Sequence, residues 1–525
     1  DGTFPNGTSA YEKRGIAVNV PEWNVETCIQ CNQCSFICPH SCVRPFLLDA
    51  QEKAAAPKAF RTQKARGKGL EDYEFRVQIS TMDCTGCGNC ADVCPAQPKA
   101  LVMKKLATQT QEQVPNWRYA VSKVANKGAL FEGRTVKDSQ FRQPLMEFSG
   151  ACAGCGEPAY IKLVTQLFGD RMMIANATGC SSIWGASAPT TAYTCDHNRH
   201  GPSWANSLFE DNAEYGYGMY LGVRQIRDGI EQNMKELLSR GLETSAPTLH
   251  DAFAHWIQVR EEGEASKEAS EQVQEVLASI LREDAPLGGE PDTVRLLKEI
   301  QKNKDYLVKR SIWMIGGDGW AYDIGYGGLD QVLASGEDVN VLVFDTEIYS
   351  NTGGQASKST PAAAVAKFAA SGKKSGKKDL GRMMMTYRNI YVAQVAMGAD
   401  KNQTLKAIRE AESYHGPSLI IAYAPCISHG LKCGMGKSMD NMAQAVAAGY
   451  WHLYRYDPDL IKEGKNPFTL DSKDPTGDFQ EFLLGQVRYA ALARQFPQHA
   501  QELFQKTAAD AAFRLEEYKK MSGKI

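Results

Sequence analysis

The chain has 525 residues, of which 43% are hydrophobic and 23% charged, and its net charge is −2. This composition is typical of a globular protein of about two to four domains, and so small a net charge predicts neither nucleic-acid nor membrane binding. No apolar run approaches the ~18 residues of a membrane helix, and no signal peptide is visible. The chain opens Asp1-Gly2-Thr3 without an initiator Met, so we expect part of a longer polypeptide or a processed product.

Two cysteine runs dominate the first hundred residues. Each has the spacing Cys-x2-Cys-x2-Cys-x3-Cys-Pro, which is typical of bacterial ferredoxins with two [4Fe–4S] clusters. The fourth cysteine of each run is expected to bind the cluster of the other run. The first cluster is therefore expected on Cys28, Cys31, Cys34 and Cys94. The second is expected on Cys84, Cys87, Cys90 and Cys38.

Zinc and disulfides are the alternatives for these cysteines. Zinc often uses Cys-x2-Cys pairs, but two matching runs of four are more than it needs. Cys42 lies outside the pattern and is expected to be a small buried hydrophobe. Fifteen cysteines grouped as metal ligands favour a reducing compartment, so we expect a cytoplasmic protein.

The sequence pattern divides the chain into four regions. We expect an extended lead-in or linker over 1–22, a ferredoxin-like domain over 23–105 with an insertion at 43–80, a connector over 106–148, and an α/β domain over 149–525. In the last region, apolar runs alternate with helical stretches, which indicates a mainly parallel sheet. Strands are expected at 171–176, 311–316, 339–344, 390–396 and 418–423. Residues 215–310 and 478–521 are expected to be helical, and 357–382 to be a mobile loop.

A third group of cysteines is spread through the α/β region. Cys152 and Cys155 open it, Cys180 follows one expected strand, and Cys426 follows another. Ligands gather beyond the carboxyl ends of strands in such sheets, so a third four-cysteine site is plausible. Ordinary buried cysteines are the alternative reading, and Cys195 and Cys433 compete for the same role.

Two polar loops follow neighbouring expected strands. Gly317-Asp318-Gly319 comes directly after one, and the run from Asp345 to Gly354 comes after the next. Mg²⁺ takes hard oxygen ligands together with phosphate oxygens. Asp318 can offer a carboxylate, Thr346 a hydroxyl and Ile348 a backbone carbonyl, and glycines let the backbone approach a diphosphate. A lone Gly-Asp-Gly would be a turn, but the pair of loops at two strand ends predicts a metal–diphosphate site.

The paired loops resemble the thiamine diphosphate signature, although Asp345-Thr346 stands where that signature usually has paired Asn. This variant is similar to that of the pyruvate:ferredoxin (flavodoxin) oxidoreductases, and the resemblance extends along the whole chain. It is carried by Asp1–Pro5, both cysteine runs, Gly150–Glu157, Thr178–Ser182, Gly317–Ala321, Tyr349–Gln355, Lys377–Gly381 and Ala424–Cys426. The fold it implies is a doubly wound α/β domain that binds thiamine diphosphate, preceded by a small α+β ferredoxin domain.

The resemblance also implies a set of site residues. A proximal [4Fe–4S] cluster maps to Cys152, Cys155, Cys180 and Cys426, and Mg²⁺ to Asp318, Thr346 and the carbonyl of Ile348. Asn351 maps to the active site. Residues implied in cofactor binding are Glu157, Gly179, Cys180, Ser181, Ser182, Gly317, Asp318, Gly319, Trp320, Thr346, Ile348, Asn351 and Thr352.

The activity implied is oxidative decarboxylation of pyruvate with coenzyme A to acetyl-CoA and CO2. Electrons would pass through three [4Fe–4S] clusters to ferredoxin or flavodoxin. The resemblance further implies N-terminal domains or subunits that hold pyruvate and coenzyme A, and a homodimer of the full enzyme. By itself, this chain is expected to bind clusters and the diphosphate end of thiamine without turning over.

Three alternatives remain open. In one, the full protein is fused to a C-terminal flavin reductase module. A relative acting on 2-oxoglutarate, a branched-chain oxo acid or oxalate would keep the same electron path. A non-catalytic electron-relay subunit would keep the clusters but not the thiamine site.

Overall fold

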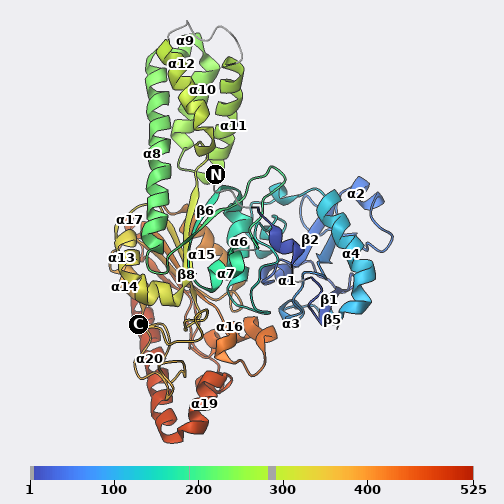
Figure 1. The fold of residues 1–525 in the computed structure, drawn as a ribbon, viewed down its shortest axis with the longest axis vertical. Helices are drawn as coiled ribbons and strands as arrows, with labels where there is room; N and C mark the ends of the chain where they lie inside the picture. The colour runs from blue at the N-terminus through green and yellow to red at the C-terminus, as the bar shows by residue number, and fades with distance from the viewer. Residues whose placement is uncertain (1–4, 13, 188–189, 282–290, 524–525) are drawn as a thin grey trace.

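The computed structural model describes residues 5–12, 14–187, 190–281 and 291–523. A cysteine-rich part lies beside a central α/β part, and a helical bundle extends from the α/β part (Figure 1). No helix within the described ranges is long and apolar enough to cross a membrane.

The cysteine-rich part contains two small antiparallel sheets. One pairs β1 (Asn19–Trp23) with β5 (Leu101–Lys105), and the other has the order β2-β4-β3. β1 begins inside the expected lead-in 1–22, and the expected connector 106–148 opens with the long helix α4 (Leu106–Lys123), which packs against β1, β4 and β5. The remaining elements are β2 (Val43–Leu48), β3 (Gln63–Lys64), β4 (Glu74–Ile79), α1 (Gln33–Phe36), α2 (Ala50–Ala54), α3 (Asn89–Asp92) and α5 (Val136–Ser139).

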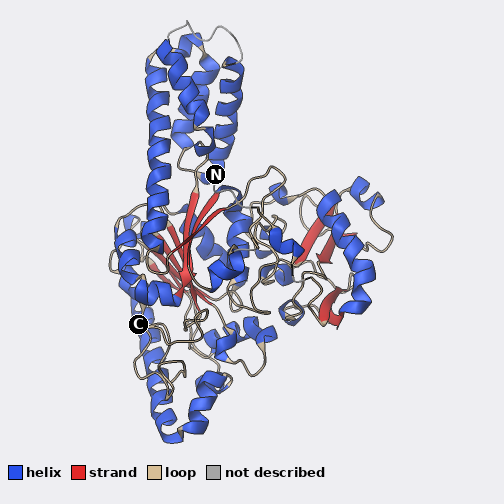
Figure 2. Cartoon of the chain, viewed as in Figure 1, coloured by secondary structure: helices blue, strands red, loops and turns tan. Residues whose placement is uncertain are grey.

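The α/β part is built on an eight-stranded sheet, drawn red in Figure 2, with the order β13-β12-β10-β11-β9-β8-β6-β7. Neighbours from β10 to β7 are parallel, whereas β12 and β13 are antiparallel. The strands are β6 (Met172–Ala177), β7 (Ser203–Ser207), β8 (Ser311–Gly317), β9 (Asn340–Asp345), β10 (Tyr391–Val395), β11 (Ser418–Tyr423), β12 (Tyr454–Tyr456) and β13 (Phe468–Leu470). The five expected strands lie within one residue of β6, β8, β9, β10 and β11, and all residues of β9, β10 and β11 are buried, as in sheets covered on both faces.

Helices lie on both sides of this sheet (Figure 1), as expected for a doubly wound α/β domain. They are α6 (Pro158–Phe168), α7 (Cys180–Gly185), α13 (Tyr326–Ala334), α14 (Leu380–Met385), α15 (Lys401–Ser413), α16 (Ser438–Ala447), α17 (Asp459–Lys462), α18 (Phe479–Leu484), α19 (Val487–Gln495) and α20 (Pro497–Met521). The expected helical tail at 478–521 corresponds to the last three of these.

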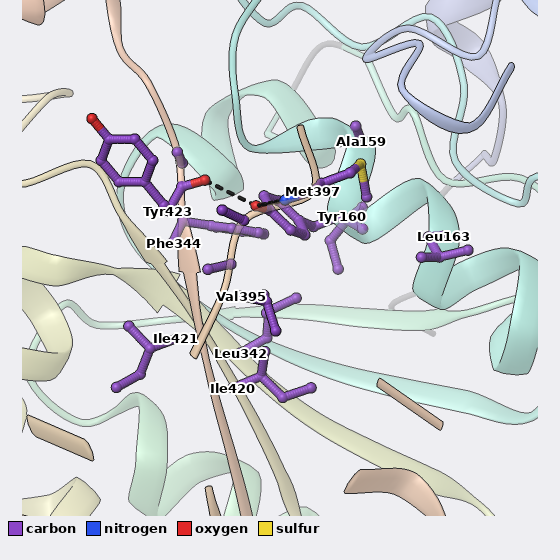
Figure 3. Close-up of a cluster of buried hydrophobic side chains, with 14 of the residues drawn as sticks. Ala159, Tyr160, Leu163, Leu342, Phe344, Val395, Met397, Ile420, Ile421 and Tyr423 are labelled. Carbon is purple, nitrogen blue, oxygen red and sulfur yellow. Dashed lines mark hydrogen bonds between the residues drawn. The ribbon is translucent and has the colours of Figure 1, made fainter. Parts of the chain in front are cut away.

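Tyr160 anchors α6 against the sheet (Figure 3). Its hydroxyl donates to the carbonyl of Tyr423 at 3.0 Å and accepts from the N–H of Met397 at 2.9 Å. Every residue of α6 is buried, including Lys162. The helix is therefore fixed in position relative to two neighbouring strand ends.

In the described part of 212–302, five helices form a bundle with its own hydrophobic core around Phe253, Trp256 and Leu297. They are α8 (Asn212–Ser239), α9 (Leu242–Ser245), α10 (Pro247–Val259), α11 (Gly263–Ile280) and α12 (Pro291–Lys302). The expectation that 215–310 is mostly helical agrees with this, except that residues 282–290 lie outside the described residues.

The segment expected to be a mobile loop, 357–382, has no named helix or strand before α14 begins at Leu380, but part of it is buried. Ala362, Ala363 and Ala364 are buried, and Nζ of Lys377 lies 2.8 Å from Oδ2 of Asp345. The segment is rich in Ala, Lys and Gly, like a linker, but its small residues pack closely and its lysine has buried partners. It belongs to the wall that supports the polar loops after β8 and β9.

Candidate functional site

A cavity of about 260 Å³ lies beyond the carboxyl ends of β6, β8 and β9. It brings together all the residues that the sequence implicated in cofactor binding except Ser182. Four residues that the sequence analysis did not single out also line it: Thr178, Phe209, Tyr349 and Ser350. Ser182 lies one layer behind, where its hydroxyl is 2.9 Å from both the N–H and the carbonyl oxygen of Gly179.

Three oxygen donors converge on one side of this cavity. Oγ1 of Thr346 lies 2.8 Å from Oδ1 of Asp318 and 3.0 Å from the carbonyl oxygen of Ile348. The other carboxylate oxygen of Asp318 accepts from the Ser357 hydroxyl at 2.5 Å. Carboxylate, hydroxyl and carbonyl oxygens are the ligands that Mg²⁺ prefers. Burial, together with the charge of Asp345, raises the pKa of Asp318 to about 7, and a bound divalent cation would oppose that rise.

The backbone around these donors needs glycine at one point in particular. A Cβ on Gly319 would lie 2.7 Å from the ring of Tyr349, closer than side chains allow. Tyr349 in turn contacts Phe209, with ring centroids 5.9 Å apart. The Gly-Asp-Gly motif therefore allows the β8 loop to approach the β9 loop closely.

Glu347 holds the β9 loop from behind and was missed by the sequence analysis. It lies between Thr346 and Ile348, has a φ of 57°, and is 1% exposed. Its carboxylate lies 3.0 Å from Nζ of Lys377 and 2.7 Å from Nη2 of Arg488. Although burial opposes ionisation, these two cations lower the pKa of Glu347 to about 2. A fixed anion thus holds a strained residue in the middle of the donor loop.

Glu157 also lines the cavity. Its Oε2 accepts from the indole N–H of Trp184 at 2.8 Å, and burial raises its pKa to about 7. Asn351 lines the same cavity, and its Oδ1 lies 4.0 Å from Sγ of Cys180. Both residues thus line the same cavity, and their roles toward a cofactor stay predictions.

Cys180 belongs both to this cavity and to the third cysteine group. Burial, followed by the charge of Glu157, raises the pKa of the Cys180 thiol, which is also influenced by Cys426 and Cys152. Burial and the charge of Glu157 also raise the pKa of the Cys155 thiol, which is influenced by Cys426 and Cys180 as well. The four expected ligands therefore share one neighbourhood. Of the competing cysteines, Cys195 packs against Gly201, and Cys433 is exposed beside Lys437.

The two cysteine runs also gather as expected from their spacing. Cys38, Cys84, Cys87 and Cys90 line one small cavity, which joins the last cysteine of the first run to the second run. Burial raises the pKa of Cys31 and Cys34, and both are also influenced by Cys28 and Cys94.

Cys42 is 1% exposed, as expected, but its thiol also forms hydrogen bonds. It donates to the carbonyl of His40 at 3.3 Å, and its hydrogen bond to Cys38 is the main reason that the pKa of Cys38 lies well below its usual value. The described residues contain no group of three His, Cys, Asp or Glu side chains close enough to hold a single metal ion.

The second cysteine run contacts the loop that carries Cys152 and Cys155. The backbone N–H of Gly154 donates to the thiol of Cys87, and a Cβ on Gly436 would lie 2.4 Å from the carbonyl oxygen of Cys87. Nδ2 of Asn89 also donates to the Ser438 hydroxyl at 2.9 Å. The order in space is therefore the cavity, the third cysteine group, the second cluster site and the first.

Comparison with known proteins agrees with this arrangement. The 4Fe-4S dicluster domain family matches residues 27–97, and the C-terminal TPP-binding domain of thiamine pyrophosphate enzymes matches residues 302–422. A domain of unknown function matches residues 1–17.

Curated relatives match the whole chain. A pyruvate-flavodoxin oxidoreductase of Klebsiella pneumoniae is 56% identical over 523 residues, covering 100% of this chain and 43% of the relative. A second from Enterobacter agglomerans and a pyruvate:ferredoxin oxidoreductase of Moorella thermoacetica are also 56% identical, each over 99% of this chain. The chain spans 43% and 44% of the length of these two relatives, respectively.

Proposed function

This chain belongs to the pyruvate-flavodoxin and pyruvate:ferredoxin oxidoreductase family, and we propose that it is the thiamine-binding and electron-transfer part of such an enzyme. The complete protein would oxidatively decarboxylate pyruvate with coenzyme A to acetyl-CoA and CO2. Ferredoxin or flavodoxin would accept the electrons. The further domains, seen in relatives more than twice as long, would hold pyruvate and coenzyme A, and the whole enzyme would be a cytoplasmic homodimer.

The residues around the cavity would hold the cofactor from two sides. Asp318, Thr346 and the carbonyl of Ile348 would bind Mg²⁺, which would bridge to the diphosphate. Gly317 leaves room for that group beside the backbone, and Gly319 lets the ring of Tyr349 close against the same loop. Thiamine diphosphate, when bound, supplies the electron sink that decarboxylation requires. Glu157 and Asn351 would lie beside the reacting end, together with Trp320 and Thr352.

One observation carries the proposal most directly. Cys180 lines the cavity and also belongs to the third cysteine group. A cluster on Cys152, Cys155, Cys180 and Cys426 would therefore sit at the wall of the reaction site. The contact between Gly154 and Cys87 continues the route to the second cluster, so electrons can leave by short steps.

The test uses the complete protein without oxygen. Pyruvate and coenzyme A are added, and cluster reduction is followed by low-temperature electron paramagnetic resonance. Reduction of three clusters that requires both reagents supports the proposal. The same experiment with 2-oxoglutarate, a branched-chain oxo acid or oxalate tests the alternative substrates, and reduction by one of these alone would replace pyruvate.

The electron-relay alternative makes a different prediction. A relay subunit would hold clusters that dithionite reduces but would bind no thiamine diphosphate. Stoichiometric binding of thiamine diphosphate with Mg²⁺ argues against a relay. Its absence from the complete protein would favour one. The oxygen donors at Asp318 and Thr346 support the enzyme rather than the relay, since a relay has no use for them.

A further inference from the structure

A buried lysine connects the α/β part to the cysteine-rich part. Lys162 lies on α6 and is 1% exposed. Its ammonium donates to the carbonyl oxygens of Ser35 and Phe36, the latter at 2.8 Å, and lies 3.4 Å from Oε1 of Gln140. Ser35 and Phe36 are the last two residues of α1, a single turn that contains Cys34 and ends just before Cys38.

The geometry indicates the charged form of this lysine. An ammonium has three N–H donors and no acceptor, and here three oxygen acceptors surround it. These contacts engage all three N–H donors, which an ammonium has and a neutral amine does not.

Among the described residues, no carboxylate lies within ion-pair distance of Lys162. Arg44, a cation that influences Lys162, already has its own carboxylate partner in Glu147. A buried charge without a counter-charge is costly, so a negative group is expected nearby. The groups that face Lys162 are the thiols of Cys34, Cys38 and Cys42.

The two cluster sites meet at this point. Cys34 belongs to the group with Cys28, Cys31 and Cys94, and Cys38 to the group with Cys84, Cys87 and Cys90. We propose that Lys162 is the shared counter-charge of both clusters and raises the reduction potential of each. This inference rests on the proposed function, because it requires clusters at both cysteine runs.

The physical reason is the change in charge on reduction. A cubane bound by four thiolates is negative, and each electron adds one more negative charge. A fixed cation in a poorly polarisable interior stabilises the reduced form more than the oxidised form. Net charge near a cluster is one of the quantities that sets its potential.

A simpler role is possible for the same contacts. Lys162 could only tie the carbonyls of α1 to α6 and so join the two parts mechanically. In that case its charge would not matter beyond its hydrogen bonds. Lys162→Gln keeps a donor and removes the charge, whereas Lys162→Arg keeps both.

The experiment measures the potentials of the clusters in the complete protein by redox titration monitored with paramagnetic resonance. In Lys162→Gln, we expect the equilibrium constant for reduction of each of the two clusters of the cysteine runs to fall at least tenfold. This corresponds to a decrease in reduction potential of 59 mV for one electron. Lys162→Arg should stay within twofold, about 18 mV on the same scale. A Lys162→Gln variant within twofold of wild type, or an equal fall in Lys162→Arg, would overturn the proposal.

A second variant leaves the lysine in place. Gln140→Glu puts a carboxylate beside the ammonium without changing the size of the side chain, and should lower both potentials in the same direction. It decides the question if Lys162→Gln fails to assemble clusters, because unchanged potentials in Gln140→Glu would overturn the proposal. The iron content of the wild-type protein distinguishes failure of this proposal from failure of the proposed function. If the cysteine runs of the wild-type protein hold no clusters, the proposed function itself is wrong.

Discussion

Nη2 of Arg488 lies 2.7 Å from Oε2 of Glu347, and each side chain is at most 2% exposed. Arg488 is on α19, near the end of the chain, whereas Glu347 is in the loop after β9. The hydroxyl of Tyr450 donates to the same carboxylate oxygen at 2.6 Å. The C-terminal helices thus hold the loop that presents Thr346 and the carbonyl of Ile348.

Removing Arg488 should loosen this loop. We expect Arg488→Met to lower the free energy of local opening around residues 345–355 by ~3–5 kcal/mol, because it leaves a buried carboxylate short of one counter-charge. Hydrogen exchange of these residues measures that opening. Arg382→Met is the matched control, since its pair with Glu517 is partly exposed and should be worth at most about 1 kcal/mol. Similar effects of the two substitutions would contradict the role given to Glu347.

The third cysteine group makes a prediction about metal content. Cys180→Ser should remove one cluster of three, so iron per chain should fall by about one third while the ferredoxin-type clusters remain. Iron analysis of anaerobically purified protein measures this. Cys195→Ser is the control, because Cys195 packs against Gly201 and not against Cys155. A loss of iron in Cys195→Ser, or none in Cys180→Ser, would point to a different ligand set.

The central strands could be predicted because both of their faces are buried. β9 and β11 read as continuous apolar runs, which leave a clear signal in the sequence. The edge strands could not, since β7 reads Ser-Trp-Ala-Asn-Ser and β12 and β13 have three residues each. Short or polar strands of this kind take their structure from neighbours far away in the chain.

The same reason explains which site residues were missed. Asp318 and Thr346 belong to motifs that directly follow strands, so their roles could be predicted from the sequence. Glu347 acquires its role only through partners such as Arg488, 141 positions away. Lys377 acquires its role through Asp345 and Glu347, 32 and 30 positions away. Likewise, nothing in the apolar sequence of α6 indicates that Lys162 reaches the turn between two cluster ligands.

A buried histidine predicts sensitivity to acid. His452 is 2% exposed, its Nε2 lies 3.3 Å from the carbonyl of Ala511, and burial lowers its pKa to about 3. The unfolded chain, with a histidine pKa of about 6.5, binds more protons between these two values. Stability should therefore fall as the pH falls from about 6.5 towards 3, and His452 alone should account for about 2 kcal/mol by pH 5.

Replacing this histidine should remove its share of the acid sensitivity. The loss of stability between pH 7 and pH 5, followed through the unfolding of the C-terminal helices, should be smaller by about 2 kcal/mol in His452→Gln. His499→Gln is the control, because that side chain is 35% exposed on α20. Equal acid sensitivity of wild type and His452→Gln would show that other groups dominate.

The metal-binding assignment is tested at Asp318. Its carboxylate is the one charged member of the three-oxygen group, so Asp318→Asn should weaken binding of thiamine diphosphate with Mg²⁺ by at least about 100-fold, given that outer-shell changes alone cost 10–100-fold. Titration calorimetry of the complete protein, with and without Mg²⁺, measures the affinity. Asp323→Asn is the control, since Asp323 lies in the same helical turn but accepts from the N–H of Lys358 and forms an ion pair with its side chain. Both variants lose a carboxylate near the cavity, but only Asp318 contacts Thr346. If both weakened binding alike, the effect would be general electrostatics, and the ligand set would have to be sought elsewhere.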